Sequence, residues 1–283
     1  MPITPSESAS FRLNLITMAH GPTTKELNHD TTPSQVFLLV TKYRNCKLAQ
    51  TLLWKGVEVT ERDPDGLTPL HWAATNDDIC TLLNILHTVT EHQPKAISSL
   101  INAQDNRGST PLHSACVNAR FQSVCILLRF NSDPNAEDFE LMTPLSNLAI
   151  AYESLSFDVP KFSPTSTFVS QIQFNILKAA ELLLQAGADI ERKDMRGRTP
   201  LAWAVVTENT KLAGLLLANG ADMDAKDDFG VSIREAVEGG FTCLTEERSF
   251  EGVPMERALQ LGKPLEMCEL LKKWGGKRSW GIG

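Results

Sequence analysis

A short turn-and-helix motif recurs along this chain, and its spacing constrains the fold more than any other feature. The clearest copy spans residues 65–74 and reads Asp-Gly-Leu-Thr-Pro-Leu-His-Trp-Ala-Ala. Two of the four intervals between successive copies are 33 residues, and the other two are longer. A fixed period interrupted by insertions indicates a solenoid of stacked repeats. The anchor residues of the copies are Thr68, Thr110, Thr143, Thr199 and Ser232.

The residue types of the motif suit the start of a helix. Glycine supplies a tight turn with a positive φ, threonine caps the orphan N–H groups, and proline fits the first helical position. A second motif lies between the anchors, where a leucine-rich run ends in Gly-Ala-Asp at Gly187 and again at Gly220. Glycine closes a helix because it adopts the left-handed conformation at little cost. Gly56 and Asn131 occupy the same place in earlier copies.

Together the two motifs resemble the ankyrin repeat family, whose unit is a β-turn and two antiparallel helices with a Thr-Pro-Leu-His signature about every 33 residues. The resemblance covers roughly residues 37–274. It implies an all-α ankyrin-repeat solenoid of about six units, including degenerate terminal caps. The long insertions fall in the third full repeat, at 152–173, and in the last repeat, at 241–263.

Three regions are expected along the chain. Residues 1–30 form an N-terminal arm that is either flexible or docked on the first repeat. Residues 31–274 form the repeat domain, which opens with a capping unit of two helices over 33–45 and 47–55. Residues 275–283 form a glycine-rich tail. The 152–173 insertion contains three phenylalanines among serines and threonines, and we expect a loop that folds back on the array.

Charge and cysteine usage narrow the class of partner. The net charge of −7 disfavours nucleic acid, which requires a basic stripe, and no apolar run is long enough to span a membrane. The chain does not open with a signal-peptide pattern. Its six cysteines include no Cys-x-x-Cys pair, so we expect reduced cysteines in a cytoplasmic or nuclear protein that needs no metal or cofactor.

No catalytic motif stands out, and the tempting residues have structural interpretations. The family resemblance implies that His71 and His113 bond to the backbone and to the cap threonine. An aspartate leads each turn, where its side chain can bond the backbone two residues later. Trp72 and Trp203 share one repeat position, and they either pack between first helices or form a partly exposed aromatic pair.

The resemblance also implies a binding surface, because ankyrin arrays bind at the turn tips and at the solvent face of the first helices. Carrying these positions over gives candidate partner-binding residues at Asp65, Thr75, Asn76, Arg107, Val117, Asn118, Phe139, Glu140, Met195, Arg196, Val206, Thr207 and Phe229. Leu141 replaces the turn glycine in the repeat that starts at Asp138, which puts the geometry of that tip in doubt.

Three functions remain open from the sequence. The first is a non-catalytic scaffold or adaptor that binds another protein through the concave groove. The second is an enzyme acting on an apolar small molecule in a pocket walled by 152–173 and 241–263, with Asp158, Glu246 or Glu247 as acid or base. The third is a regulatory or targeting subunit that docks through its arm or its Trp280 tail.

Overall fold

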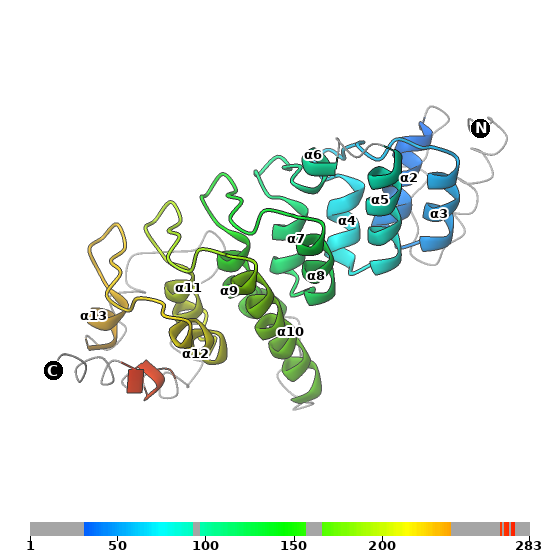
Figure 1. Ribbon diagram of the computed structural model, residues 1–283. Helices are drawn as coiled ribbons and strands as arrows, with labels where there is room; N and C mark the ends of the chain where they lie inside the picture. Colours follow the sequence, from blue (N-terminus) through cyan, green and yellow to red (C-terminus); the bar gives the residue numbers. More distant parts are fainter. Residues whose placement is uncertain are drawn as a thin grey trace.

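Stacked pairs of antiparallel helices make up the protein (Figure 1). The computed structural model describes residues 31–92, 97–156, 166–238, 267, 269–271, 273 and 274, with backbone alone for 152–156, 166–169 and 236–238. Over these residues the regular structure is helical, and Lys226 and Ser232 form an isolated β-bridge. The all-α solenoid predicted from the repeats is therefore confirmed. The N-terminal arm, the 241–263 insertion and the 275–283 tail lie outside the described residues.

Each pair consists of a first helix that follows a turn and a second helix that returns. The first helices are α2 (Pro33–Lys42), α4 (Pro69–Asn76), α7 (Pro111–Val117), α9 (Pro144–Ser156), α11 (Pro200–Val206) and α13 (Ile233–Glu238). The second helices are α3 (Cys46–Trp54), α5 (Ile79–His92), α8 (Phe121–Arg129), α10 (Ser166–Gln185) and α12 (Thr210–Ala218). A short helix, α6 (Ile97–Ile101), follows α5, and the described residues between 267 and 274 are also helical.

Neighbouring pairs share one continuous core. From α2 to α11 each first helix packs on the next first helix, and from α3 to α12 each second helix packs on the next second helix. The leucine two residues after each threonine anchor is fully buried, at Leu70, Leu112, Leu145 and Leu201. Small residues such as Ala73, Ala115 and Ala204 are also fully buried on the first helices. Because they leave room for close helix approach, each pair buries its apolar face on its neighbours.

The helix ends follow the chemistry of the two motifs. Thr68 and Thr110 cap α4 and α7 with the histidine three residues later, and Thr199 accepts a hydrogen bond from the Ala202 N–H at 3.3 Å. The second helices end at left-handed residues, where φ is 77° at Gly56, 63° at Asn131, 89° at Gly187 and 94° at Gly220. Both predictions about the helix ends are confirmed at these positions.

The first capping helix is shorter than expected, and it begins differently from the later ones. The α2 helix ends at Lys42 because Arg44 turns into the left-handed region with φ 60°. Thr32 caps it in a capping box, in which the Gln35 side chain accepts from the Thr32 N–H at 3.0 Å. The capping unit therefore uses Gln35 where the full repeats use histidine.

The described parts of the 152–173 insertion are helical, where a loop was expected. Residues 152–156 continue α9, and residues 166–173 form the first two turns of the 20-residue α10. Ile172, Ile176, Ala179, Ala180 and Leu183 are buried at helical spacing, which shows that the apolar periodicity already runs through the end of the insertion. Its serine and phenylalanine content concealed that period. Residues 157–165 lie outside the described range.

The expectation of six reduced cysteines is wrong for one pair. Cys46, at the start of α3, and Cys80, in the first turn of α5, form a disulfide with their Cα atoms 6.2 Å apart. Their sequence separation is 34 residues, about one repeat period, so consecutive second helices bring them together. Cys116 is a free, fully buried thiol on α7, and its burial raises its pKa above the ordinary value for a thiol.

A prediction follows from Leu141, which occupies the glycine position of its turn with φ 57°. The left-handed conformation costs a residue with a Cβ about 1 kcal/mol. We expect Leu141→Gly to be more stable than Leu141→Ala by about 1 kcal/mol, because both variants lose the leucine side chain and the glycine variant alone also loses the strain. Urea unfolding of both variants measures this difference. Equal stability, or a more stable alanine variant, would show that the backbone at 141 is not strained.

Candidate partner-binding surface

An aspartate fixes each turn between helix pairs. Its Oδ1 accepts hydrogen bonds from the backbone N–H groups two and four residues later, at distances of 2.8 to 3.1 Å. This confirms the prediction that these residues shape the turns, and the turn with Leu141 keeps the same geometry. The five aspartates are Asp63, Asp105, Asp138, Asp194 and Asp227.

Two of these aspartates are braced by tryptophan. The Trp72 indole N–H donates to Oδ2 of Asp63 at 3.0 Å, and the Trp203 indole N–H donates to Oδ2 of Asp194 at 2.9 Å. Trp203 is 3% exposed and Trp72 is half-buried, so the paired position is not an exposed aromatic pair. These hydrogen bonds were not predicted from the sequence, although each tryptophan stands nine residues after its aspartate.

Backbone hydrogen bonds join each turn tip to the next. The carbonyl oxygens of Asp65, Arg107, Glu140 and Arg196 accept from an N–H of the following tip, at distances of 2.9 to 3.1 Å. The tips approach so closely that a Cβ at Gly108 would lie 2.8 Å from the Phe139 nitrogen. The turn glycine is therefore required both by its positive φ and by the space that the next tip occupies. The tips form a single connected row.

The C-terminal part of this row exposes large apolar side chains. Phe139 is 66% exposed, Met195 is 61% exposed and Phe229 is 60% exposed. Leu141, which was not among the candidate residues, is also exposed at 43%. Asp65, Arg107, Glu140 and Arg196 are also exposed along the row of tips.

Candidate positions on the first helices divide into two kinds. Val117 is exposed, and Thr75 and Val206 are half-buried, so these side chains reach the surface. At the position after Thr75 and after Val117, an asparagine side chain bonds to backbone carbonyls within the repeat array. Asn76 donates to the carbonyls of Thr41 and Lys42, at 3.3 and 3.0 Å, and Asn118 donates to the Ser114 carbonyl at 2.8 Å.

Thr207 is a correction to the expected surface. It is 6% exposed, and its Oγ1 donates to the Ala149 carbonyl on the preceding first helix at 3.0 Å. Position-by-position transfer from the family pattern placed it on the solvent face. Threonine can instead turn its hydroxyl to a neighbouring carbonyl, and here that bond links α11 to α9.

The two histidines connect consecutive repeats. Nδ1 of His71 accepts from the Thr68 N–H at 3.1 Å, and its Nε2 lies 3.0 Å from the Ser109 carbonyl of the next repeat. His113 repeats this arrangement with Thr110 and with the Met142 carbonyl. Because Nε2 must donate to a carbonyl while Nδ1 accepts, the ring is neutral. Burial lowers the pKa of His71 to about 4, and it also lowers the pKa of His113.

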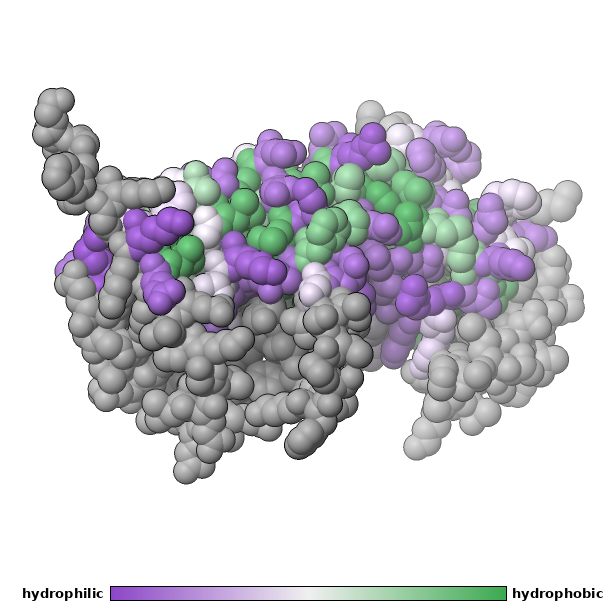
Figure 2. Space-filling model, turned by 90° about the horizontal axis from the view of Figure 1, so that it is seen from below, coloured by the Kyte–Doolittle hydropathy of each residue, from purple (hydrophilic) through white to green (hydrophobic). Residues whose placement is uncertain are grey.

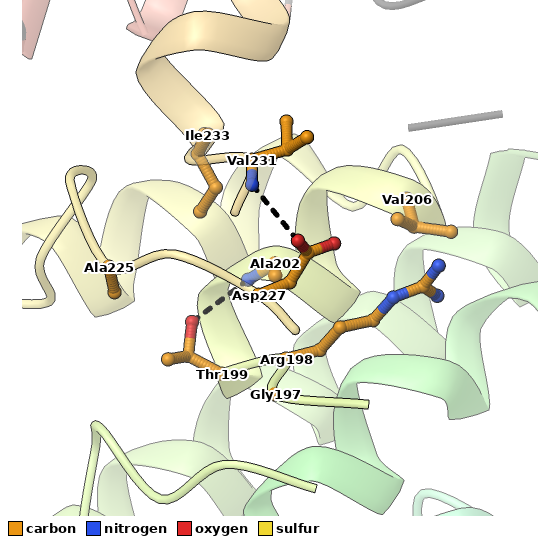
Figure 3. A pocket seen from close by; sticks show the side chains of 9 residues that line it. All are labelled: Gly197, Arg198, Thr199, Ala202, Val206, Ala225, Asp227, Val231 and Ile233. Atoms are coloured by element: carbon orange, nitrogen blue, oxygen red, sulfur yellow. Dashed lines mark hydrogen bonds between the residues drawn. The ribbon is translucent and has the colours of Figure 1, made fainter. Parts of the chain in front are cut away.

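Two hollows bear on the small-molecule alternative. The first, shown in Figure 3, has a volume of about 10 Å³, which is room for roughly one water molecule. It lies beside the buried Arg198, whose guanidinium sits 4.9 Å from the centre of the Trp203 ring. The second, of about 380 Å³, is open and lined mainly by charged residues between 137 and 193.

Neither hollow is an apolar pocket of ligand size. Of the expected walls of the catalytic alternative, 152–173 and 241–263, the structure describes side chains only at 170–173. The expected acid or base residues, Asp158, Glu246 and Glu247, lie outside the described residues. Within the described ranges, no group of three or more His, Cys, Asp or Glu side chains is placed to hold a metal ion. In the same ranges no helix has the length and apolar character to cross a membrane.

The fold and the surface define a helical-repeat solenoid with a row of projecting turn tips. The family model described as "Ankyrin repeats (3 copies)" matches residues 37–138, and the model described as "Ankyrin repeat" matches residues 196–228. Residues 37–138 and 196–228 of this chain are therefore ankyrin repeats.

Similar proteins share this array within much longer chains. Neurogenic locus notch homolog protein 1 of Xenopus laevis is 26% identical over 61% of this chain and 8% of its own length. The mouse B-cell lymphoma 3 protein homolog is 28% identical over 64% of this chain and 42% of its own length. Human transient receptor potential cation channel subfamily A member 1 is 28% identical over 66% of this chain and 18% of its own length. The chain thus matches less than half of each relative.

The buried histidines predict a pH dependence of stability. The folded-state pKa of His71 lies near 4 and its unfolded value is 6.5, so the unfolded chain takes up protons first as the pH falls. Its contribution is complete above pH 6.5 and is lost progressively toward pH 4. We expect the free energy of unfolding to fall between pH 7 and pH 5 by about 1 to 2 kcal/mol from His71, and His113 should add a loss in the same direction.

The double variant His71→Gln/His113→Gln should abolish most of this loss, measured by urea unfolding at pH 7 and pH 5. Glutamine can still cap the helix, as Gln35 does with Thr32. His92→Gln, at an exposed position, is the matched control and should behave like the unmodified protein. A double variant that loses as much stability as the parent would contradict the role of the neutral rings.

Proposed function

We propose that the array of residues 31–274 is a non-catalytic scaffold or adaptor that binds another protein through the surface formed by its turn tips and first helices. Ankyrin repeats generally mediate protein–protein interaction. The observation that carries the proposal for this chain is the run of three consecutive tips that expose Phe139, Met195 and Phe229 by at least 60%. Exposed apolar side chains gathered on one surface mark interaction sites.

The turns hold these side chains on a rigid frame. Phe139 and Met195 each donate a backbone hydrogen bond to the preceding tip, and Phe229 donates to Oδ1 of Asp227. Because the backbone is already fixed, a partner need not order it, and less free energy is lost on binding. Aromatic and methionine side chains on such a frame are typical energetic centres of an interface.

Charge is arranged along the same row. The sequence of tips carries Asp65, Arg107, Glu140, Arg196 and Asp228, so the sign alternates from one repeat to the next. Alternating charge gives little net attraction for nucleic acid. It can discriminate between protein partners, because a partner's own charges must match the order of charges along the tips. The apolar tips then supply affinity, and the charged tips supply specificity.

The rest of the surface is mixed. In the view of Figure 2, hydrophobic patches lie along the array between hydrophilic side chains. Trp54, at the end of α3, is 82% exposed, and Phe174, on α10, is 48% exposed. These residues belong to second helices, away from the tips, and provide a comparison for the proposed surface. We place the binding in the cytoplasm or nucleus, in keeping with the free thiols of Cys116 and Cys125.

The proposal predicts that a triple variant, Phe139→Asp/Met195→Asp/Phe229→Asp, loses its partners. Each of these side chains should contribute about 1.4 kcal/mol or more, so we expect at least about a tenfold loss of affinity for each position. Quantitative affinity purification from cells expressing the unmodified chain, the triple variant and Trp54→Asp measures the loss. The Trp54→Asp control removes an even more exposed aromatic side chain from a second helix and should retain the same partners.

Urea unfolding of the three proteins separates a binding defect from a folding defect, and we expect the midpoints to agree. Recovery of the same partners by the triple variant at undiminished levels would rule out the tip surface. Loss of the same partners in Trp54→Asp, with the triple variant unaffected, would move the interface to the second helices.

A further inference from the structure

We propose that Cys46 and Cys80 form a thiol–disulfide exchange site, whose substrate is a low-molecular-weight disulfide, and that the exchange fastens or releases the N-terminal helix pair. This inference is independent of the partner-binding proposal. It concerns the junction between α2–α3 and α4–α5, at the end of the array away from the apolar tips.

Helix geometry brings the two cysteines together. Cys46 is the first residue of α3, and Cys80 is the second residue of α5. The two helices pack side by side, and the Cα atoms lie 6.2 Å apart. This separation is within the usual range of about 4.4 to 6.8 Å for disulfides, so the pair can open and close without moving either helix far.

The surroundings favour reaction. Cys80 is exposed and Cys46 is half-buried, so small reagents can reach the pair. Both residues lie in the first turn of a helix, where the helix dipole stabilises a thiolate. The Asn84 side-chain amide donates to Sγ of Cys80 at 3.6 Å, which adds a donor for a negatively charged sulfur. Cys116 shows the contrast, because its full burial raises its pKa and removes it from exchange.

Within the described ranges, the bond spans a junction that has no counterpart of the histidine links at the next two junctions. The Gln35 side chain bonds back to Thr32 within its own helix end, whereas His71 reaches forward to the next repeat. Residues before 31 lie outside the described part of the chain, and the first turn-to-turn backbone bond within that part joins Asp65 and Asn106, one junction later. Asn76 supplies polar links at the first junction through the Thr41 and Lys42 carbonyls, and the Lys42 ammonium lies 5.3 Å from the centre of the Trp72 ring.

The exchange balances with a small disulfide as oxidant. The Cys80 thiolate attacks one sulfur of the small disulfide, which forms a mixed disulfide and releases one thiolate. The Cys46 thiolate then attacks the Cys80 sulfur, which forms the Cys46–Cys80 bond and releases the second thiolate. The protein loses two protons and two electrons, and the small disulfide becomes two thiols. An excess of small thiol reverses both steps.

Terminal repeats unfold locally before internal ones, because they have a neighbour on one side only. The Cys46–Cys80 bond ties the start of α3 to α5 and opposes this opening. Reduction therefore leaves the body of the array folded and increases the opening of α2 and α3. The protein senses the thiol–disulfide ratio at one end of its array.

The test uses the full chain equilibrated with mixtures of reduced and oxidised glutathione. Alkylation and peptide mass mapping should recover a Cys46–Cys80 linked peptide under oxidising conditions and two alkylated cysteines under reducing conditions. Hydrogen exchange of residues 33–54 should be at least about tenfold faster in the reduced protein, while exchange of α7 and α8 should not change. Cys46→Ser and Cys80→Ser should each exchange like the reduced protein at every ratio.

Cys125→Ser is the matched control, since it removes a free cysteine from α8, and it should keep the full redox response. The proposal is overturned if oxidised glutathione leaves both cysteines open to alkylation. It is also overturned if the bond forms and exchange of residues 33–54 stays the same in the two states. A response that persists in Cys46→Ser would assign the effect to another cysteine and would equally overturn it.

Discussion

Each helix pair in this protein is stable only against its neighbours, and this dependence governs the rest of the structure. The buried leucine of each first helix and the small residues beside it face the adjacent pair as well as their own partner helix. Polar links follow the same logic, because His71, His113 and Thr207 all bond to a carbonyl of an adjacent repeat. Stability is therefore a sum of junctions, and a change at one junction acts mainly on the two pairs that share it.

The junctions are not equivalent. The histidines bond across the two junctions that follow α4 and α7. In the later repeats Ser146 and Ala202 occupy the histidine position, and their side chains are too short to reach the next repeat. The first junction instead has the Cys46–Cys80 bond, and the junction between α9 and α11 has Thr207. Different chemistry thus performs the same task along the array, with different responses to pH and to thiols.

The sequence predicted the repeating features well, because each anchor reports a local constraint. The threonine caps, the left-handed residues at Gly56 and Asn131, and the turn aspartates all follow from short-range backbone chemistry. Features that depend on how neighbouring helices pack were not predicted. The Cys46–Cys80 bond required knowing that one repeat period separates neighbouring helix starts, and Thr207 required knowing which way a helix position faces. The binding role of the tip residues stays a prediction.

The turn-to-turn backbone bonds have a consequence for how such a protein can change over time. The geometry of the row is carried by main-chain atoms, by the turn aspartates and by glycine, whereas the Met195 and Phe229 side chains at the tips are mostly exposed. Substitutions at the exposed tip side chains can therefore change the binding surface one position at a time, while the spacing between the turns stays the same. New partner specificities can therefore evolve with little loss of folding stability.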